Sequence, residues 1–124
     1  MVGFKLSAMA QIKLDVLTEG RRKYDHIHSL VEQYGAAKVG DDTLLGSLAR
    51  TATDVGRVFM NNGYGLMADH SNQIAMLAKR GVGKQTKLRT FREAIASVRS
   101  AMDHTEKMIV EEEKKAHEAP GSGA

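Results

Sequence analysis

The stretch AKRGVGKQTK, residues 78–87, combines glycine, lysine and threonine in the way that phosphate-binding loops do. A nucleotide-binding P-loop has a first glycine, a glycine–lysine pair five residues later, and then the serine or threonine that holds magnesium. It also lies between a strand and a helix. Here Ala78 occupies the first glycine position, Gln85 follows Lys84, and an amphipathic helical pattern precedes the stretch. The sequence therefore does not predict nucleotide hydrolysis.

A simpler anion site is still compatible with this stretch. The free backbone N–H groups and the dipole at the start of a helix attract anions, and a helix is expected to begin near Lys84. Basic residues also gather here, because residues 79–99 contain seven of them and only Glu93 as an acid, whereas residues 100–124 are net acidic. The side chains that we expect to bind an anion or a partner are Lys79, Arg80, Lys84, Lys87, Arg89 and Arg92.

The basic residues of 79–99 and the acidic residues of 100–124 form a charge gradient along the expected last helix, and the direction of this gradient requires an explanation. Cations near the start of a helix and acids near its end oppose the helix dipole, by about a few tenths of a kcal/mol each. A polyanion at the basic end would favour the arrangement, and so would antiparallel self-association that pairs the basic half of one last helix with the acidic half of another. A merely solvated charged surface is the third interpretation.

The positions of the aromatic residues weaken the case for nucleic-acid binding. Phe91 falls on an apolar stripe, and no other aromatic is interleaved with the basic residues to stack on a base. Binding of a nucleic acid would then depend on phosphate contacts and have little sequence specificity. A membrane surface is disfavoured, because no apolar wedge accompanies the same charges.

Catalytic and metal-binding patterns are absent from the sequence. His26 and His28 are two residues apart and point to different faces of a helix, and the chain has no Glu-x-x-His. The pairs Asp25–His28 and Glu113–His117 have a spacing that would let both side chains reach one metal, but His117 lies on a terminal charged stretch. There is no cysteine, and Asp103-His104 has no nucleophile arranged beside it. We therefore predict no catalytic residue, metal or cofactor, and no enzyme. His70, on an apolar stripe, is expected to be a partly buried residue.

The elements that must carry these residues are helical. The 124 residues include one proline, no tryptophan and 7 methionines, which is typical of an all-α protein. Residues 1–118 are predicted to form a single domain and residues 119–124 a flexible tail. The absence of cysteine and of a long apolar run favours the cytoplasm or another reducing compartment.

Apolar residues recur every three or four positions in four segments: 6–34, 42–60, 66–80, and from Leu88 to about residue 118. The two middle segments are each too short to cover the outer ones, and laid end to end they match them. We therefore predict an antiparallel three-helix, coiled-coil-like bundle whose middle helix is kinked or broken at NNGYG, residues 61–65. A four-helix bundle is the alternative, if that break reverses the chain.

These patterns lead to one functional hypothesis and one alternative. The leading hypothesis is a non-enzymatic interaction or scaffold module that self-associates as a homodimer and docks an unidentified protein partner, with Tyr64 as a contact residue. The alternative is a basic module that binds nucleic acid or another polyanion through residues 79–99.

Overall fold

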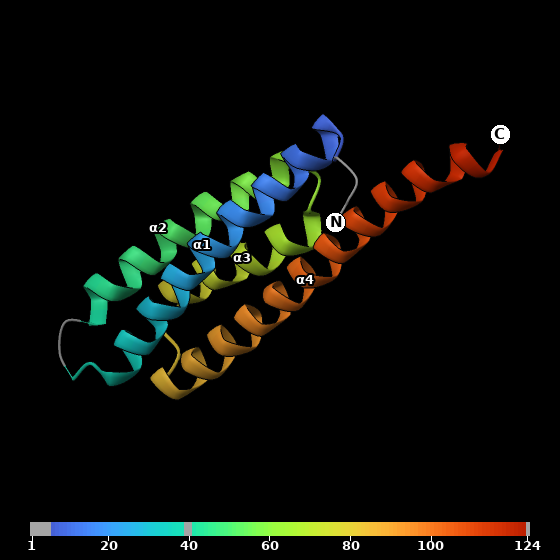
Figure 1. Cartoon of the computed structure of the whole chain (residues 1–124). Coiled ribbons are helices and arrows are strands. Elements are labelled where there is room, and N and C mark those ends of the chain that lie inside the picture. Colours follow the sequence, from blue (N-terminus) through green and yellow to red (C-terminus); the bar gives the residue numbers. More distant parts are fainter. Residues whose placement is uncertain (1–5, 39–40, 124) are drawn as a thin grey trace.

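The computed structural model describes residues 6–38 and 41–123, and side chains as far as Ala116, so the side chain of His117 lies outside it. The described part contains no strand and four helices: α1 (Ala8–Ala36), α2 (Asp41–Asn61), α3 (Gly65–Lys79) and α4 (Lys84–Gly123) (Figure 1). The all-α prediction is confirmed. No helix among the described residues is both long enough and apolar enough to cross a membrane.

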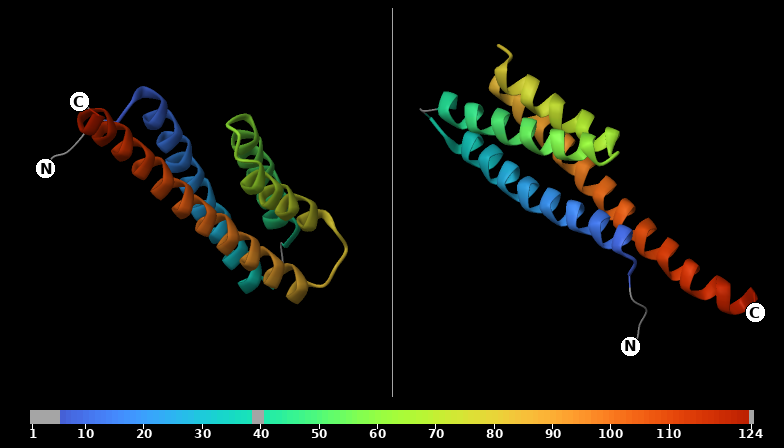
Figure 2. Two further views of the ribbon diagram at one scale, coloured as in Figure 1. Left: turned by 90° about the vertical axis from the view of Figure 1, so that its right-hand side faces the viewer. Right: turned by 90° about the horizontal axis from the view of Figure 1, so that it is seen from above.

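The helices are arranged as a ring in which each packs against the next, and α4 packs back on α1 (Figures 1 and 2). α2 and α3 lie side by side, so the predicted three-helix bundle with an end-to-end middle rod is replaced by its four-helix alternative. The cause is the turn after α2. Gly63 has a positive φ of 82°, and the Tyr64 N–H donates to the Phe59 carbonyl at 2.9 Å, which reverses the chain instead of kinking it.

Glycines allow two close approaches between helices. α1 runs unbroken through Gly20, where a Cβ atom would lie 2.8 Å from the Phe59 ring of α2 and 3.4 Å from the Met102 sulfur of α4. A Cβ atom on Gly56 of α2 would lie 2.8 Å from Asn72 Oδ1 of α3. α2 therefore packs tightly against α3 at Gly56, whereas Gly46 has only the Arg50 side chain near it.

The predicted apolar stripes form the core. Phe59 and Phe91 are fully buried, together with Tyr24. The Ser71 hydroxyl donates to the Met67 carbonyl at 2.8 Å and lies 2.6 Å from the Tyr24 hydroxyl. Because the one Ser71 proton is already donated, Tyr24 is the donor to Ser71. This hydrogen bond joins α1 to α3, which face each other across the ring.

Helix lengths leave one end of the bundle incompletely covered. α1 and α4 have 29 and 40 residues, whereas α2 and α3 have 21 and 15. The α2–α3 hairpin therefore ends before the other two helices, and it diverges from them (Figure 2). We call this the open end, and its exposed apolar side chains are Met9, Ile12, Met60, Leu66 and Met108. α4 is helical to Gly123, past Pro120, and the flexibility of residues 119–124 stays a prediction.

Candidate interaction surfaces

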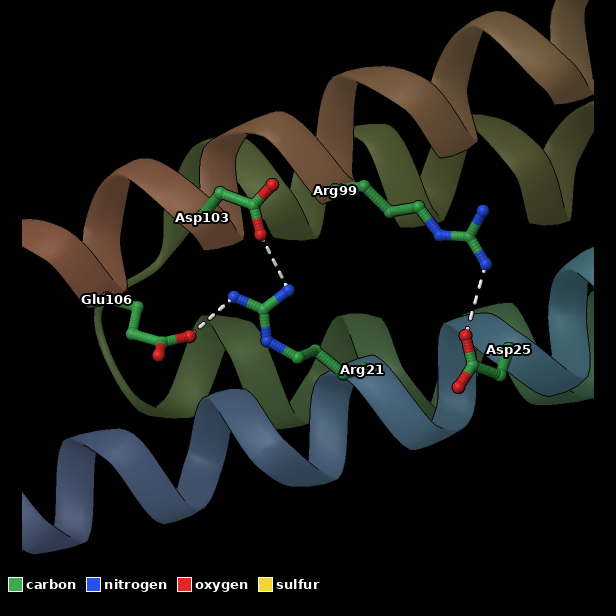
Figure 3. Close-up of polar contacts among 5 residues, drawn as sticks. All are labelled: Arg21, Asp25, Arg99, Asp103 and Glu106. Carbon is green, nitrogen blue, oxygen red and sulfur yellow. Dashed lines mark hydrogen bonds and ion pairs between the residues drawn. The ribbon is translucent and has the colours of Figure 1, made fainter.

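Exposed ion pairs join α1 to α4 along their contact, which we call the α1–α4 seam. Arg21 of α1 donates to Asp103 at 2.7 Å and to Glu106 at 2.6 Å, and these carboxylates raise the pKa of the guanidinium. In the opposite sense, Arg99 of α4 donates to Asp25 of α1 at 3.1 Å (Figure 3). The seam therefore carries arginine on both helices.

The seam explains the charge gradient of α4. Arg92 pairs with Glu32 at 3.1 Å and lowers the pKa of that carboxyl group, while Glu113 accepts a hydrogen bond from the Ser7 backbone N–H at 2.8 Å. The basic half of α4 thus lies beside Asp25 and Glu32 of α1. Its acidic half lies beside Arg21 and the start of α1. The charges of α4 are thus paired with those of α1, which is a fourth explanation of the gradient beside the three that the sequence left open.

Lys84 connects the two inter-helix segments at the other end of the bundle, which we call the closed end. Its Nζ atom donates to the Ala37 carbonyl at 2.6 Å and lies 3.4 Å from Asp41 Oδ2. It also lies 4.9 Å from the centre of the Tyr34 ring. Lys84 was expected to bind an anion or a partner, and the structure gives it contacts that stabilise the fold.

The remaining basic residues of 79–99 divide by exposure. Lys87 is buried, with its Nζ atom 3.4 Å from the Ala78 carbonyl, and Arg92 and Arg99 are held in the α1–α4 seam. Lys79, Arg80 and Arg89 are exposed, and no described carboxylate pairs with them. Four of the seven basic residues therefore contact their own chain, which leaves three on the surface.

A cavity of about 890 Å³ lies at the closed end, between α2 and the segment that joins α3 to α4. The residues 78–82 from the phosphate-like stretch line one side of it, and α2 lines the other. Its charged side chains are Arg50, Lys79, Arg80 and Lys87, with Asp42 and Asp54. Sequence reasoning found the basic residues of 79–87 but not Arg50, because only the packing of α2 brings it here. We call this the basic cavity.

A groove of about 820 Å³ lies between the start of α3 and the middle of α4. It brings together Tyr64, His70 and His104, with hydroxyl groups of Ser97 and Ser100 nearby. Tyr64 is half-buried, and its ring packs edge-on against that of Phe59, with the ring centres 6.5 Å apart. It is therefore only partly available as a contact residue. Within the described part of the chain, no hydrogen bond joins a groove hydroxyl to either imidazole, and no three metal-ligating residues cluster.

Comparisons with known proteins add no relative. No protein-family model matches the chain, and no curated protein or solved structure matches it either.

Proposed function

We propose that this protein is a non-enzymatic helical interaction module that self-associates as a dimer through the open end. The observation that carries the proposal is a pair of exposed large apolar side chains in the first turns of α1. Met9 is 67% exposed and Ile12 is 56% exposed, whereas Ala10 and Leu17, on the face of the same helix that is turned to the core, are buried. The first turns of α1 therefore have apolar residues on the core-facing side and also beside it, where no other helix covers them.

A pair of helices cannot bury both of its apolar faces alone, so helices pack in layers or bundles. At the open end, α1 and α4 extend beyond α2 and α3 as such a pair. Burial of large apolar side chains contributes roughly 1.5–3 kcal/mol for each that is fully covered. Met9 and Ile12, which lie in the first turns of α1, would both be stabilised by a partner that covers them.

A second copy of the chain is the partner that fits this shape. Two α1–α4 pairs brought together by a twofold axis make four helices, which restores the layer that the short hairpin does not supply. In such an isologous contact each apolar residue is used twice. Methionine side chains adapt to irregular contacts, and three of the five exposed apolar residues of the open end are methionines.

Docking of a further protein partner is the second part of the proposal. The groove between α3 and α4 supports it, because the groove adjoins the open end and combines the 64% exposed Leu66 with the polar tips of Tyr64 and His104. Tyrosine is enriched among residues that dominate binding energy.

Light-scattering mass on a sizing column tests self-association. The chain has a mass of 13.5 kDa, and we expect twice that for the native protein at both about 150 mM and about 500 mM salt, because apolar contacts do not depend on counterions. The double variant Met9→Glu, Ile12→Glu should be monomeric and retain its helical circular dichroism, since both side chains are exposed.

Met76→Glu is the matched control, because Met76 is 59% exposed but lies in the second half of α3, away from the open end. It should leave the dimer intact. A native protein that stays monomeric at high concentration would refute self-association. Equal disruption by Met76→Glu would show that the open end is not the interface.

The alternative, a basic module that binds nucleic acid or another polyanion, rests on the three exposed cations Lys79, Arg80 and Arg89. The same column run tests it through the absorbance ratio at 260 and 280 nm. A heavy, 260-rich peak that becomes clean protein at high salt would support this alternative. Reversal of these three residues to glutamate should then abolish the peak, and it avoids Lys84, which contacts Ala37 and Asp41, and the buried Lys87.

A further inference from the structure

The basic cavity differs from the rest of the surface in how its charges are arranged. Four cationic side chains line it, and two carboxylates, Asp42 and Asp54, oppose them. Asp54 already lies 3.7 Å from Arg57 on the same helix. The lining therefore has an excess of positive charge. It comes from α2 on one side, and from the end of α3, the segment after it and the start of α4 on the other, so that only the fold brings Arg50 to the basic stretch.

Lys87 is the least ordinary member of this lining. It is 6% exposed, and lysine is almost never fully buried unless it is paired. An ammonium group can donate three hydrogen bonds, yet the described residues give Lys87 one, to the Ala78 carbonyl, at a long 3.4 Å. No described carboxylate forms an ion pair with it.

A buried cation needs a compensating charge, because removing an ion from water without one is costly. The Ala78 carbonyl near the end of α3 supplies a part of it through the helix dipole. Lys79 and Arg80 lie beside the same carbonyl and add further positive charge. Around Lys87, on the side that faces the cavity, positive charge therefore exceeds negative charge.

We propose that the basic cavity is a binding site for a small phosphorylated molecule, with Lys87 as the buried point charge. Arg80 and Arg50, on opposite sides of the cavity, supply guanidinium groups that suit phosphate oxygens. The cavity is of the size that binds small ligands, which is roughly 300–1,000 Å³. Leu45, Ala49 and Val82 give it an apolar wall, which fits a ligand whose phosphate is attached to an apolar body.

This site goes beyond the proposed self-association, since it lies at the closed end and shares no residue with the open end. It also differs from the P-loop that the sequence excludes. Gly81 and Gly83 lie in the segment between α3 and α4, and a Cβ atom on either would meet no neighbouring atom. Side-chain cations, rather than a glycine-rich cradle, provide the site.

Sodium pyrophosphate is the probe, and isothermal titration calorimetry at a constant ionic strength of about 150 mM is the measurement. We expect saturable 1:1 binding to the native protein. Arg80→Gln removes an exposed guanidinium without touching the core and should weaken binding about tenfold or more. Lys87→Met keeps the length and apolar stem of the side chain and should abolish detectable binding.

Lys107→Met is the matched control, because Lys107 is an exposed lysine of the same helix that lies outside the cavity. It should leave the affinity unchanged. Absence of saturable binding to the native protein would overturn the proposal and leave Lys87 as a cap for the end of α3. Equal weakening by Lys107→Met would overturn it too, by showing diffuse attraction to net charge. If Lys87→Met does not fold, the proposal is tested by comparing the affinity of Arg80→Gln for pyrophosphate with that of Lys107→Met.

Discussion

The centre of the bundle and the α1–α4 seam hold α1 in place by different physical means. At the centre, Tyr24 and Phe59 are fully buried, the Tyr24 hydroxyl is bonded to Ser71, and the Phe59 ring lies against Gly20, which has no side chain. At the seam, arginines and carboxylates meet in solvent, and the carboxylates of Asp25 and Asp103 are 77% and 70% exposed. Buried contacts depend on shape, whereas exposed ion pairs depend on charge and are screened by salt.

The two regions should therefore differ in how much a substitution changes the free energy of unfolding. A charge at the seam can be replaced at small cost, because water solvates whatever is left. A group at the centre cannot be changed without leaving a cavity, an overlap or an unpaired polar atom. We therefore expect large effects at the centre and small ones at the seam, and three variants test this order.

The largest effect should come from ionisation of Tyr24. Burial raises the pKa of its hydroxyl to about 12, from about 10 in an unfolded chain. The folded state thus holds this proton more tightly, so its stabilisation is fully present below pH 10 and is lost as the pH rises through 12. The two-unit difference corresponds to about 3 kcal/mol of the free energy of unfolding.

Urea unfolding at several pH values between 9 and 12.5 measures this loss. Tyr24→Phe cannot ionise, so its free energy of unfolding should fall by about 3 kcal/mol less than that of the native protein over the range. Other titrations are shared by the two proteins and cancel in the difference. Parallel curves would mean that Tyr24 is accessible to water.

A smaller effect is expected from Gly20→Ala. The new Cβ atom would lie 2.8 Å from the fully buried Phe59 ring, which has no room to move. Overpacking of this kind costs roughly 1–3 kcal/mol, partly offset by the roughly 1 kcal/mol that alanine gains over glycine in a helix. We expect a net destabilisation of up to about 2 kcal/mol in urea unfolding.

Gly46→Ala is the control for this substitution. Only the Arg50 guanidinium, at 3.6 Å, approaches the position of its Cβ atom, so the helical gain should appear without the overlap. This variant should be stabilised by up to about 1 kcal/mol. Destabilisation of both variants by a similar amount would contradict the close packing of α1 on Phe59.

The smallest effect is expected at the seam. Arg21→Gln removes the ion pairs with Asp103 and Glu106, and exposed pairs contribute about 0.2–1 kcal/mol. The loss should shrink between 50 mM and 500 mM salt, which urea unfolding at both concentrations measures. Arg22→Gln, whose partner Glu19 is on the same helix, is the control. A decrease of more than about 2 kcal/mol in the free energy of unfolding on Arg21→Gln would mean that the seam contributes to stability as much as the buried centre does.

Local periodicity was enough to locate the helices. The stripes on 42–60 and 66–80 correspond closely to α2 (Asp41–Asn61) and α3 (Gly65–Lys79), and Phe59 and Phe91 are buried as their spacing predicts. The turn at 61–65 was found, but whether it kinks or reverses the chain depends on the φ angle of Gly63. A glycine permits both outcomes, so the pattern could not decide between three helices and four.

The candidate surfaces were predictable only in part, because they depend on which helices are neighbours. The sequence showed the basic residues of 79–99 as a cluster of charge, but it did not show which groups they contact. Lys84 reaches the Ala37 carbonyl, and Arg92 reaches Glu32, across intervals of 47 and 60 residues. Ser71 looked like an ordinary helical serine, and nothing local marked it as the acceptor for Tyr24.

The ring order of the helices has a consequence for how the chain comes together. Three of the four helix contacts join helices that are consecutive in sequence, but the seam joins Arg21 to Asp103, 82 residues away. Closing a loop of that length costs roughly 4 kcal/mol in chain entropy, against roughly 1 kcal/mol for a three-residue turn. The contact that is entropically most expensive to close is thus the one whose polar links are open to water. We therefore expect the contact between α1 and α4 to be the last of the four helix contacts to form as the chain folds.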